Sequence, residues 1–164
     1  MKTANKGEWS ELYALLLILA YGKIRETDAS LKGLDQFMEV EECFGPGGRA
    51  ECAEYKIHAD AKEVEVYYNG GLHKVLSMET LADYANEIYE GIAQGEGAFA
   101  IKGAENVIEE IGCAKIKSPS YNKADIQIRT AKDKKPMGYS IKSFLGGNPT
   151  LINASKQTNF RYEV

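Results

Sequence analysis

The sequence of 164 residues has few of the residues that build metal-stapled or disulfide-bonded folds. It contains three cysteines, Cys43, Cys52 and Cys113, two histidines and no Cys-x-x-Cys motif. This spacing argues against a structural zinc site, which needs four closely spaced ligands. We therefore expect reduced thiols in a cytoplasmic protein, with a bridge between Cys43 and Cys52 as the alternative.

The sequence also lacks a long hydrophobic run. The longest, Leu12 to Tyr21, has ten residues, far fewer than the roughly 20 needed to cross a bilayer. It predicts a core helix and no membrane partner. No small-residue cleavage site follows it, so we expect no signal peptide. Internal repeats and low-complexity tracts are absent as well, which is typical of a globular domain.

Charge is divided unevenly along the chain. The formal net charge is −4, with 44% hydrophobic and 27% charged residues. Residues 1–114 hold 10 Lys+Arg and 21 Asp+Glu, a balance of −11, whereas residues 115–164 hold 10 and 3, a balance of +7. A basic final third on an acidic body favours an edge that faces a polyanion. A solvated, lysine-rich hairpin is the equally acceptable alternative.

Hydrophobic periodicity outlines the secondary structure. A helix is predicted over residues 5–23, capped by Asn5 and stopped by Gly22, with Trp9 on its core side. Ser77 is the expected cap of the next helix. Further helices are predicted over 78–94 and 104–112, strands over 36–44, 54–59, 63–68, 72–77 and 98–102, and a hairpin over 124–142. This order predicts an α/β or α+β domain with a mixed sheet.

The hairpin carries an acid, Asp125, and a base, Lys142. In its first strand Asp125, Gln127 and Arg129 share one face, because side chains alternate along a strand. If no bulge intervenes and the turn centres on residues 133–134, Asp125 pairs with Lys142 and Ile126 with Ile141. The simpler interpretation is a cross-strand salt bridge on a solvated face, worth at most ~1 kcal/mol.

The first helix offers a second acid. Glu8 and Glu11 are three residues apart and therefore fall on one helical face. Two carboxylates and a lysine suit phosphodiester hydrolysis, because carboxylate oxygens bind Mg²⁺ and lysine can act on water or phosphate charge. The glycines of residues 143–150 would allow a ligand to approach the backbone closely.

Two long segments resemble a known family. Residues 5–16, NKGEWSELYALL, and residues 138–160, GYSIKSFLGGNPTLINASKQTNF, are similar to HpaII-type type II restriction endonucleases. The strand 124–128, ADIQI, stands where that family has its first catalytic strand. The resemblance spans the chain. It implies the PD-(D/E)xK restriction-endonuclease-like fold, a mixed sheet flanked by helices, in a single nuclease domain over 1–164 that forms the N-terminal part of a longer enzyme.

The same resemblance implies Mg²⁺-dependent cleavage of double-stranded DNA at CCGG. Asp125 matches the first metal-binding aspartate and Lys142 the lysine of the second half-motif. The chain departs from the superfamily at Ala124, which replaces a proline, and at Ser140, which stands where an acid is usual. The spacing of KGEWSE over 6–11 resembles that of members that take this carboxylate from the first helix, so Glu11 is the first choice and Glu8 the second. Gln127 would help to orient water or phosphate.

Several polar residues near the C-terminal end are candidate DNA contacts, and loop residues that satisfy their own backbone are the alternative. They are Lys156, Asn153, Ser155, Asn159 and, at the hairpin tip, Lys134. A palindromic site would favour a homodimer. The rival hypothesis is a non-catalytic α/β module that binds nucleic acid or protein through the basic hairpin, and Ser140 in the place of an acid favours it.

Overall fold

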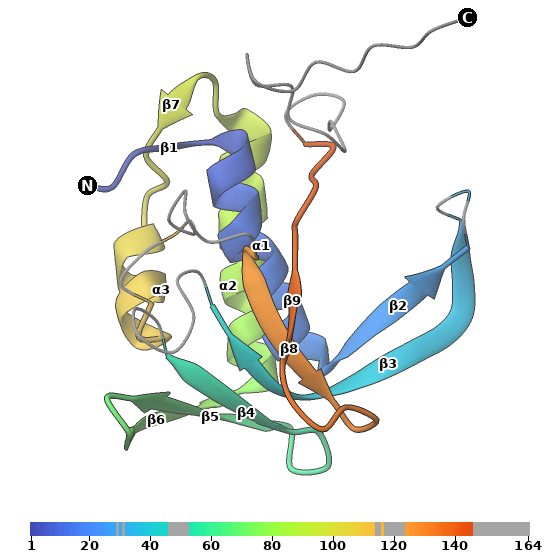
Figure 1. Ribbon diagram of the computed structural model, residues 1–164. Coiled ribbons are helices and arrows are strands. Elements are labelled where there is room, and N and C mark those ends of the chain that lie inside the picture. The colour runs from blue at the N-terminus through green and yellow to red at the C-terminus, as the bar shows by residue number, and fades with distance from the viewer. Residues whose placement is uncertain (29, 31, 46–52, 114–115, 117–123, 146–164) are drawn as a thin grey trace, which may run out of the picture.

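The computed structural model describes residues 1–28, 30, 32–45, 53–113, 116 and 124–145. Three helices and nine strands occur in these residues (Figure 1). In chain order they are β1 Ala4–Asn5, α1 Lys6–Tyr21, β2 Lys23–Thr27, β3 Gly33–Phe44, β4 Glu54–His58, β5 Glu63–Tyr68, β6 Gly71–Ser77, α2 Met78–Gln94, β7 Ala98–Phe99, α3 Ala104–Glu110, β8 Ile126–Thr130 and β9 Met137–Tyr139.

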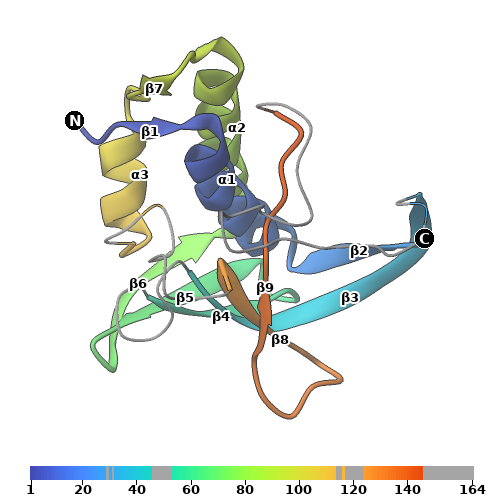
Figure 2. The same cartoon turned by 45° about the horizontal axis from the view of Figure 1, so that its top comes forward.

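One large sheet dominates the structure. Its strand order is β6-β5-β4-β3-β8-β9, and β2 pairs separately with β3. A two-stranded sheet joins β1 to β7. Figures 1 and 2 show α1, α2 and α3 on the same side of the large sheet. The predicted class, helices flanking a large sheet as in restriction endonucleases, is confirmed. Every strand pair in the described residues is antiparallel.

Helix α1 begins where its sequence provides a cap. The side chain of Asn5 accepts the backbone N–H of Glu8 at 3.0 Å, and the Glu8 carboxylate accepts the backbone N–H of Asn5 at 3.0 Å. This reciprocal capping box satisfies two N–H groups that the helix itself leaves unpaired. The helix ends at Gly22, whose φ of 64° is left-handed, a conformation that glycine adopts without steric cost.

The core lies between the helices and the inner face of the sheet. Trp9, Leu12 and Leu16 of α1 are fully buried, and Val64 and Val66 of β5 point toward them. Trp9 also donates its indole N–H to the Phe99 carbonyl at 3.0 Å, so the prediction that it packs in the core is confirmed. None of the helices in the described residues is long and apolar enough to span a bilayer.

Charged residues line up across the outer face of the sheet, away from the helices. The register places Arg129 opposite Glu42, Glu42 opposite Lys56, and Lys56 opposite Glu65. Opposite charges on neighbouring strands stabilise the pairing modestly, by roughly 0.2–1 kcal/mol per pair. The sheet therefore has one apolar and one charged face, as the alternating sequences of its strands require.

The structure differs from the sequence prediction at several strands. Strand β2 was not predicted, and β3 begins at Gly33 rather than at residue 36. The predicted strand over 98–102 is only the two residues of β7, because its pairing with β1 covers no more. Helix α3 ends at Glu110.

Candidate functional site

Asp125 lies immediately before β8 and is fixed by the neighbouring chain. Its backbone N–H donates to the Tyr139 carbonyl at 2.9 Å. Its carboxylate Oδ2 accepts the backbone N–H of Ile141 at 2.7 Å. Hydrogen bonds from backbone N–H groups to carboxylates are among the stronger ones in proteins. The half-buried carboxylate is therefore held at the point where the β8–β9 pairing ends.

The predicted pairing of Asp125 with Lys142 is wrong by two residues. Ile126 pairs with Tyr139 rather than with Ile141, and Gln127 pairs with Gly138. The turn explains the shift: Asp133 accepts from the Thr130 hydroxyl at 2.8 Å and donates its own N–H to the Thr130 carbonyl at 3.0 Å. This local turn forms directly after β8, so the hairpin centres one residue earlier than expected.

The shift leaves the faces unchanged, because side chains alternate with a period of two. Continuing the observed register by one step sets Ser140 across from Asp125 and Lys142 diagonally beyond it. Diagonal neighbours are about 7–8 Å apart, within reach of a long side chain. Ser140 and Lys142 are exposed, whereas Ile141 and Ser143 between and beyond them are half-buried. Exposed and half-buried side chains therefore alternate along this segment.

Helix α1 packs beside the same segment. The hydroxyl oxygens of Ser10 and Ser143 lie 2.9 Å apart, although 133 residues separate them in the sequence. Figures 1 and 2 show the chain after β9 running alongside α1. Glu11, next to Ser10, is half-buried. The structure thus places α1 against the segment that contains Lys142, and Ile141 ties that segment to Asp125. The predicted Asp125–Lys142 pair itself is not formed.

The two candidate acids of α1 have different surroundings. The Glu8 carboxylate closes the capping box by accepting the Asn5 N–H, which gives it a structural role at the helix N-terminus. Glu11 lies one turn further along, beyond the cap. Glu8 thus has a structural contact at the helix start, and the choice of Glu11 as the second carboxylate stays a prediction.

The predicted acids are of the chemical type that binds magnesium. Mg²⁺ in nucleases is usually held by one or two carboxylates, with waters and substrate phosphates completing its shell. Asp125 and Glu11 supply hard oxygen atoms of this kind. Within the described residues, no group of three or more histidine, cysteine, aspartate or glutamate side chains is placed to hold a metal ion. Such a site would consequently depend on DNA phosphates for part of its coordination.

Arg129 is a residue whose importance the sequence reasoning overlooked. It shares the strand face of Asp125 and Gln127, and it forms ion pairs with Glu41 and, at 2.8 Å, with Glu42. The hydrogen bond that Arg129 donates to Glu42, supported by the one to Glu41, raises the pKa of Arg129 above its ordinary value despite partial desolvation. The cation therefore ties β8 to β3. Two adjacent acids at 41–42 were the signal that could have revealed it.

The hairpin tip is open to solvent. Lys134 is exposed, as are Lys132 and Lys135 beside it. A groove of about 450 Å³ separates this hairpin from the arm formed by β2 and β3, with Phe37, Lys132, Met137 and Tyr139 among its walls. Tyr139 connects the groove to the Asp125 region, since its carbonyl accepts the Asp125 N–H. Four candidate DNA contacts, Lys156, Asn153, Ser155 and Asn159, lie outside the described residues.

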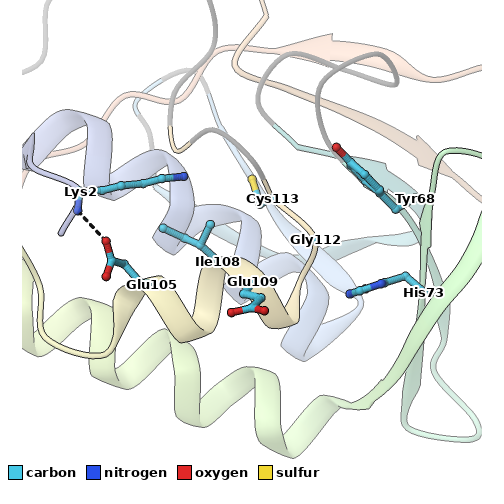
Figure 3. Close-up of a pocket in the computed structure, with 8 residues that line it drawn as sticks. All are labelled: Lys2, Tyr68, His73, Glu105, Ile108, Glu109, Gly112 and Cys113. Carbon is cyan, nitrogen blue, oxygen red and sulfur yellow. Dashed lines mark hydrogen bonds between the residues drawn. The ribbon is translucent and has the colours of Figure 1, made fainter.

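A second cleft, of about 430 Å³, lies between α3 and the β5–β6 hairpin. Figure 3 shows His73, Tyr68 and Cys113 along one part of it and Lys2, Glu105 and Glu109 along the other. The backbone N–H of Lys2 donates to Glu105 at 3.1 Å, which closes that end. Among the predicted site residues that the structure describes, none lines this cleft.

The chain is similar to known restriction enzymes. The family model described as HpaII restriction endonuclease matches residues 5–164. A type II restriction enzyme, HpaII from Haemophilus parainfluenzae, is 33% identical over 170 residues, which covers 99% of this chain and 46% of that enzyme. The chain thus spans about half the length of this relative. No solved structure matches. The extent of these matches shows that the chain belongs to the HpaII restriction endonuclease family.

Proposed function

We propose that this chain carries the catalytic centre of a Mg²⁺-dependent type II restriction endonuclease that hydrolyses double-stranded DNA at CCGG. The observation that carries the proposal is the family match over residues 5–164. The geometry supports it, since the Asp125 carboxylate is anchored to the segment that contains Lys142. With Asp125, Glu11 and Lys142 as its members, the proposed site would have the two-acid, one-lysine composition of the PD-(D/E)xK nucleases.

Each residue has a distinct role in this proposal. Asp125 and Glu11 hold Mg²⁺, with Glu8 as the second choice. The bound ion stabilises charge on the scissile phosphate and lowers the pKa of its water. Lys142, exposed at the sheet edge, orients the attacking water or neutralises phosphate charge. Gln127 points to the same face and assists in orienting water. Ser140 is uncharged and cannot replace the acid usual at its position.

Contacts to DNA belong to the basic part of the chain. Lys134 at the exposed hairpin tip is a phosphate contact, because lysine clusters provide sequence-independent affinity. We assign Lys156, Asn153, Ser155 and Asn159 to phosphate or base-edge contacts. A palindromic target favours a homodimer, in which each copy cuts one strand. We place the protein in the cytoplasm, where its cysteines would stay reduced.

Plasmid cleavage tests the proposal directly. The full chain is incubated with Mg²⁺ and two plasmids, one with several CCGG sites and one without any. We expect discrete fragments from the first plasmid only, and none in the presence of a chelator. Lys142→Ala should cleave neither plasmid. Lys102→Ala, which changes another exposed lysine that has no role in the proposed site, is the matched control and should cleave like wild type.

The controls separate the possible failures. If the folded wild-type chain leaves both plasmids intact, the proposed activity of this chain is wrong. If Lys142→Ala retains wild-type cleavage, the assignment of Lys142 is wrong. If both plasmids are degraded, the proposed CCGG specificity is wrong.

A further inference from the structure

Ser10 is a buried hydroxyl on an otherwise apolar helix face. It is 2% exposed and, with Thr130, makes up the buried polar residues of the described chain. Its neighbours Trp9 and Leu12 are fully buried. A hydroxyl buried without hydrogen-bond partners costs free energy, so native proteins keep one there only with its partners supplied. The partners of Ser10 therefore indicate what the residue does.

Ser10 is part of a chain of hydrogen bonds that crosses from helix to strand. Its hydroxyl donates to the Lys6 carbonyl at 2.7 Å, and the Ser143 hydroxyl oxygen lies 2.9 Å away. Ser143 in turn accepts the backbone N–H of Leu145 at 3.1 Å. Each hydroxyl has a single hydrogen. The bonds are satisfied together if Leu145 donates to Ser143, Ser143 donates to Ser10, and Ser10 donates to Lys6.

This chain of bonds lies beside both candidate functional side chains. Glu11 follows Ser10 in α1, and Lys142 precedes Ser143. The strand β9 ends at Tyr139, so the position of residues 140–145 depends on contacts beyond regular pairing. In the described residues these contacts include the bond from Ile141 to Asp125 and the Ser10–Ser143 bond. The first ties the segment to β8, and the second ties it to α1.

We propose that Ser10 and Ser143 are a positioning pair that sets the separation between Glu11 and Lys142. The inference rests on the proposed nuclease function. A hydrogen bond fixes two backbones at a defined distance and direction, which apolar packing at the same place does not. Neither serine touches substrate in this scheme. Removing a group that orients functional side chains typically costs about 10–100-fold in activity or metal affinity.

Kinetics of single and double variants test the pair. Ser10→Ala and Ser143→Ala are each expected to lower kcat about 10–100-fold, with little change in KM for DNA and with a higher Mg²⁺ concentration for half-maximal rate. The double variant should lose no more than either single variant, because both remove the same bond. Single variants with wild-type kcat and wild-type Mg²⁺ dependence would overturn the proposal.

The matched control is Ser77→Ala. Ser77 also makes a structural hydroxyl contact, because its oxygen accepts the Thr80 backbone N–H at 3.0 Å at the start of α2. Its loss should lower Tm without changing kcat at a temperature where the variant is folded. A similar fall in kcat for Ser77→Ala would mean that activity reports only general stability, and the proposal would be wrong.

Rescue by a covalent link gives a second test. In Ser10→Cys/Ser143→Cys, a disulfide would join the same two positions when oxidised glutathione accepts the two electrons and two protons of the thiols. We expect activity to rise about tenfold or more on oxidation and to fall again with a reductant. The single cysteine variants are the controls and should not respond. An oxidised, cross-linked variant with no gain in rate would contradict the proposal.

Amide hydrogen exchange tests the Ser10–Ser143 pair without relying on nuclease activity. In Ser10→Ala the Leu145 and Ile141 amides should exchange faster, whereas amides of α2 should keep their protection. Isothermal calorimetry with Mg²⁺ alone should show weaker binding than for wild type. Failure of wild type to cleave DNA would remove the nuclease function. Unchanged exchange in Ser10→Ala would remove the positioning pair, whatever the activity.

Discussion

Asp125 makes a structural contact that its sequence position alone does not reveal. Its carboxylate is the leading candidate for a metal ligand, and the same group accepts the Ile141 N–H at 2.7 Å. The hydrogen bond extends the β8–β9 pairing past Tyr139. Substitutions at residue 125 should therefore separate into those that remove only charge and those that also remove the acceptor.

Asp125→Asn and Asp125→Ala are expected to differ in stability but not in activity. Both should abolish DNA cleavage in the presence of Mg²⁺. Asn keeps an acceptor for Ile141, whereas Ala leaves that N–H without it, at a cost of about 1–3 kcal/mol. Urea denaturation measures the difference, and cleavage assays measure activity. Equal stability of the two variants would show that the Ile141 bond contributes nothing measurable.

Glu65 is a residue whose pKa is changed by hydrogen bonds to its neighbours on the sheet. The Tyr67 hydroxyl donates to Glu65 at 2.8 Å, and His58 lies 3.3 Å away. The hydrogen bond from Tyr67, and then that from His58, lowers the pKa of Glu65 below its ordinary value of 4.5. The same bond raises the pKa of Tyr67. The stabilisation by Glu65 is thus complete above pH 4.5 and is lost as pH falls through the lower pKa of the folded state.

Tyr67→Phe should raise the pKa of Glu65 toward 4.5, because it removes the largest cause of the shift. Carbon-detected NMR titration of the carboxyl group between pH 2 and 7 would measure it. Tyr68→Phe is the matched control: Tyr68 follows in β5 but points to the other face of the sheet. If Tyr67→Phe leaves the pKa unchanged, the Tyr67–Glu65 bond is not formed in solution.

At the scale of elements, capping residues fix where α1 begins and ends, and a side-chain contact fixes how it packs. The capping box at Asn5 and Glu8 fixes where the helix begins, and Gly22 fixes where it ends. The bond from Ser10 to Ser143 then fixes how the helix meets the strand segment after β9. The helix start therefore matters to the candidate site, because it sets the rotation of Glu11 about the helix axis.

Asn5→Ala should destabilise the protein by about 1 kcal/mol through loss of the helix cap. Asn5→Asp, which keeps an acceptor at the N-cap and adds charge favourable to the helix dipole, should stay within about 0.5 kcal/mol of wild type. Thermal unfolding monitored by circular dichroism measures both. A loss of stability in Asn5→Asp equal to that in Asn5→Ala would show that the cap contributes little.

At the scale of the whole molecule, charge is separated more than the net value of −4 suggests. The acidic part, residues 1–114, forms α1, α2, α3 and most of the sheet. In the basic part, exposed lysines lie at the tip of the β8–β9 hairpin. Arg129, between them, is paired with Glu41 and Glu42. DNA affinity in the described part would therefore come from the hairpin rather than from the body.

Replacing the hairpin lysines by glutamine should weaken DNA binding. It should also make the binding constant less dependent on salt concentration. Each lost phosphate contact reduces the slope of log K against log salt by about 0.9 for duplex DNA. For the triple variant of Lys132, Lys134 and Lys135, we expect the slope to fall by the equivalent of about one to three phosphate contacts. Fluorescence anisotropy at several salt concentrations measures the slope. An unchanged slope would show that this hairpin does not contact DNA.

The features that were predicted correctly depend on interactions between residues that are close together in the chain. The extent of α1, its cap at Asn5 and the burial of Trp9 were predicted, because they depend on residues within one or two turns. The alternation along residues 125–129 was predicted for the same reason. The register of the hairpin was not predicted, because it depends on the hydrogen bond between Thr130 and Asp133 in the turn. Hydrophobic periodicity carries no information about such a bond.

By itself, the sequence determined the helices, the alternation of most strands, the reversal of charge after residue 114 and the resemblance that led to the family. Each of these is written in neighbouring residues or in a recognisable motif. Only the tertiary structure decided that Glu8 closes a cap, that Asp125 accepts from Ile141, and that Ser10 meets Ser143. These contacts join positions that chain connectivity does not bring together, so they depend on how the whole core packs.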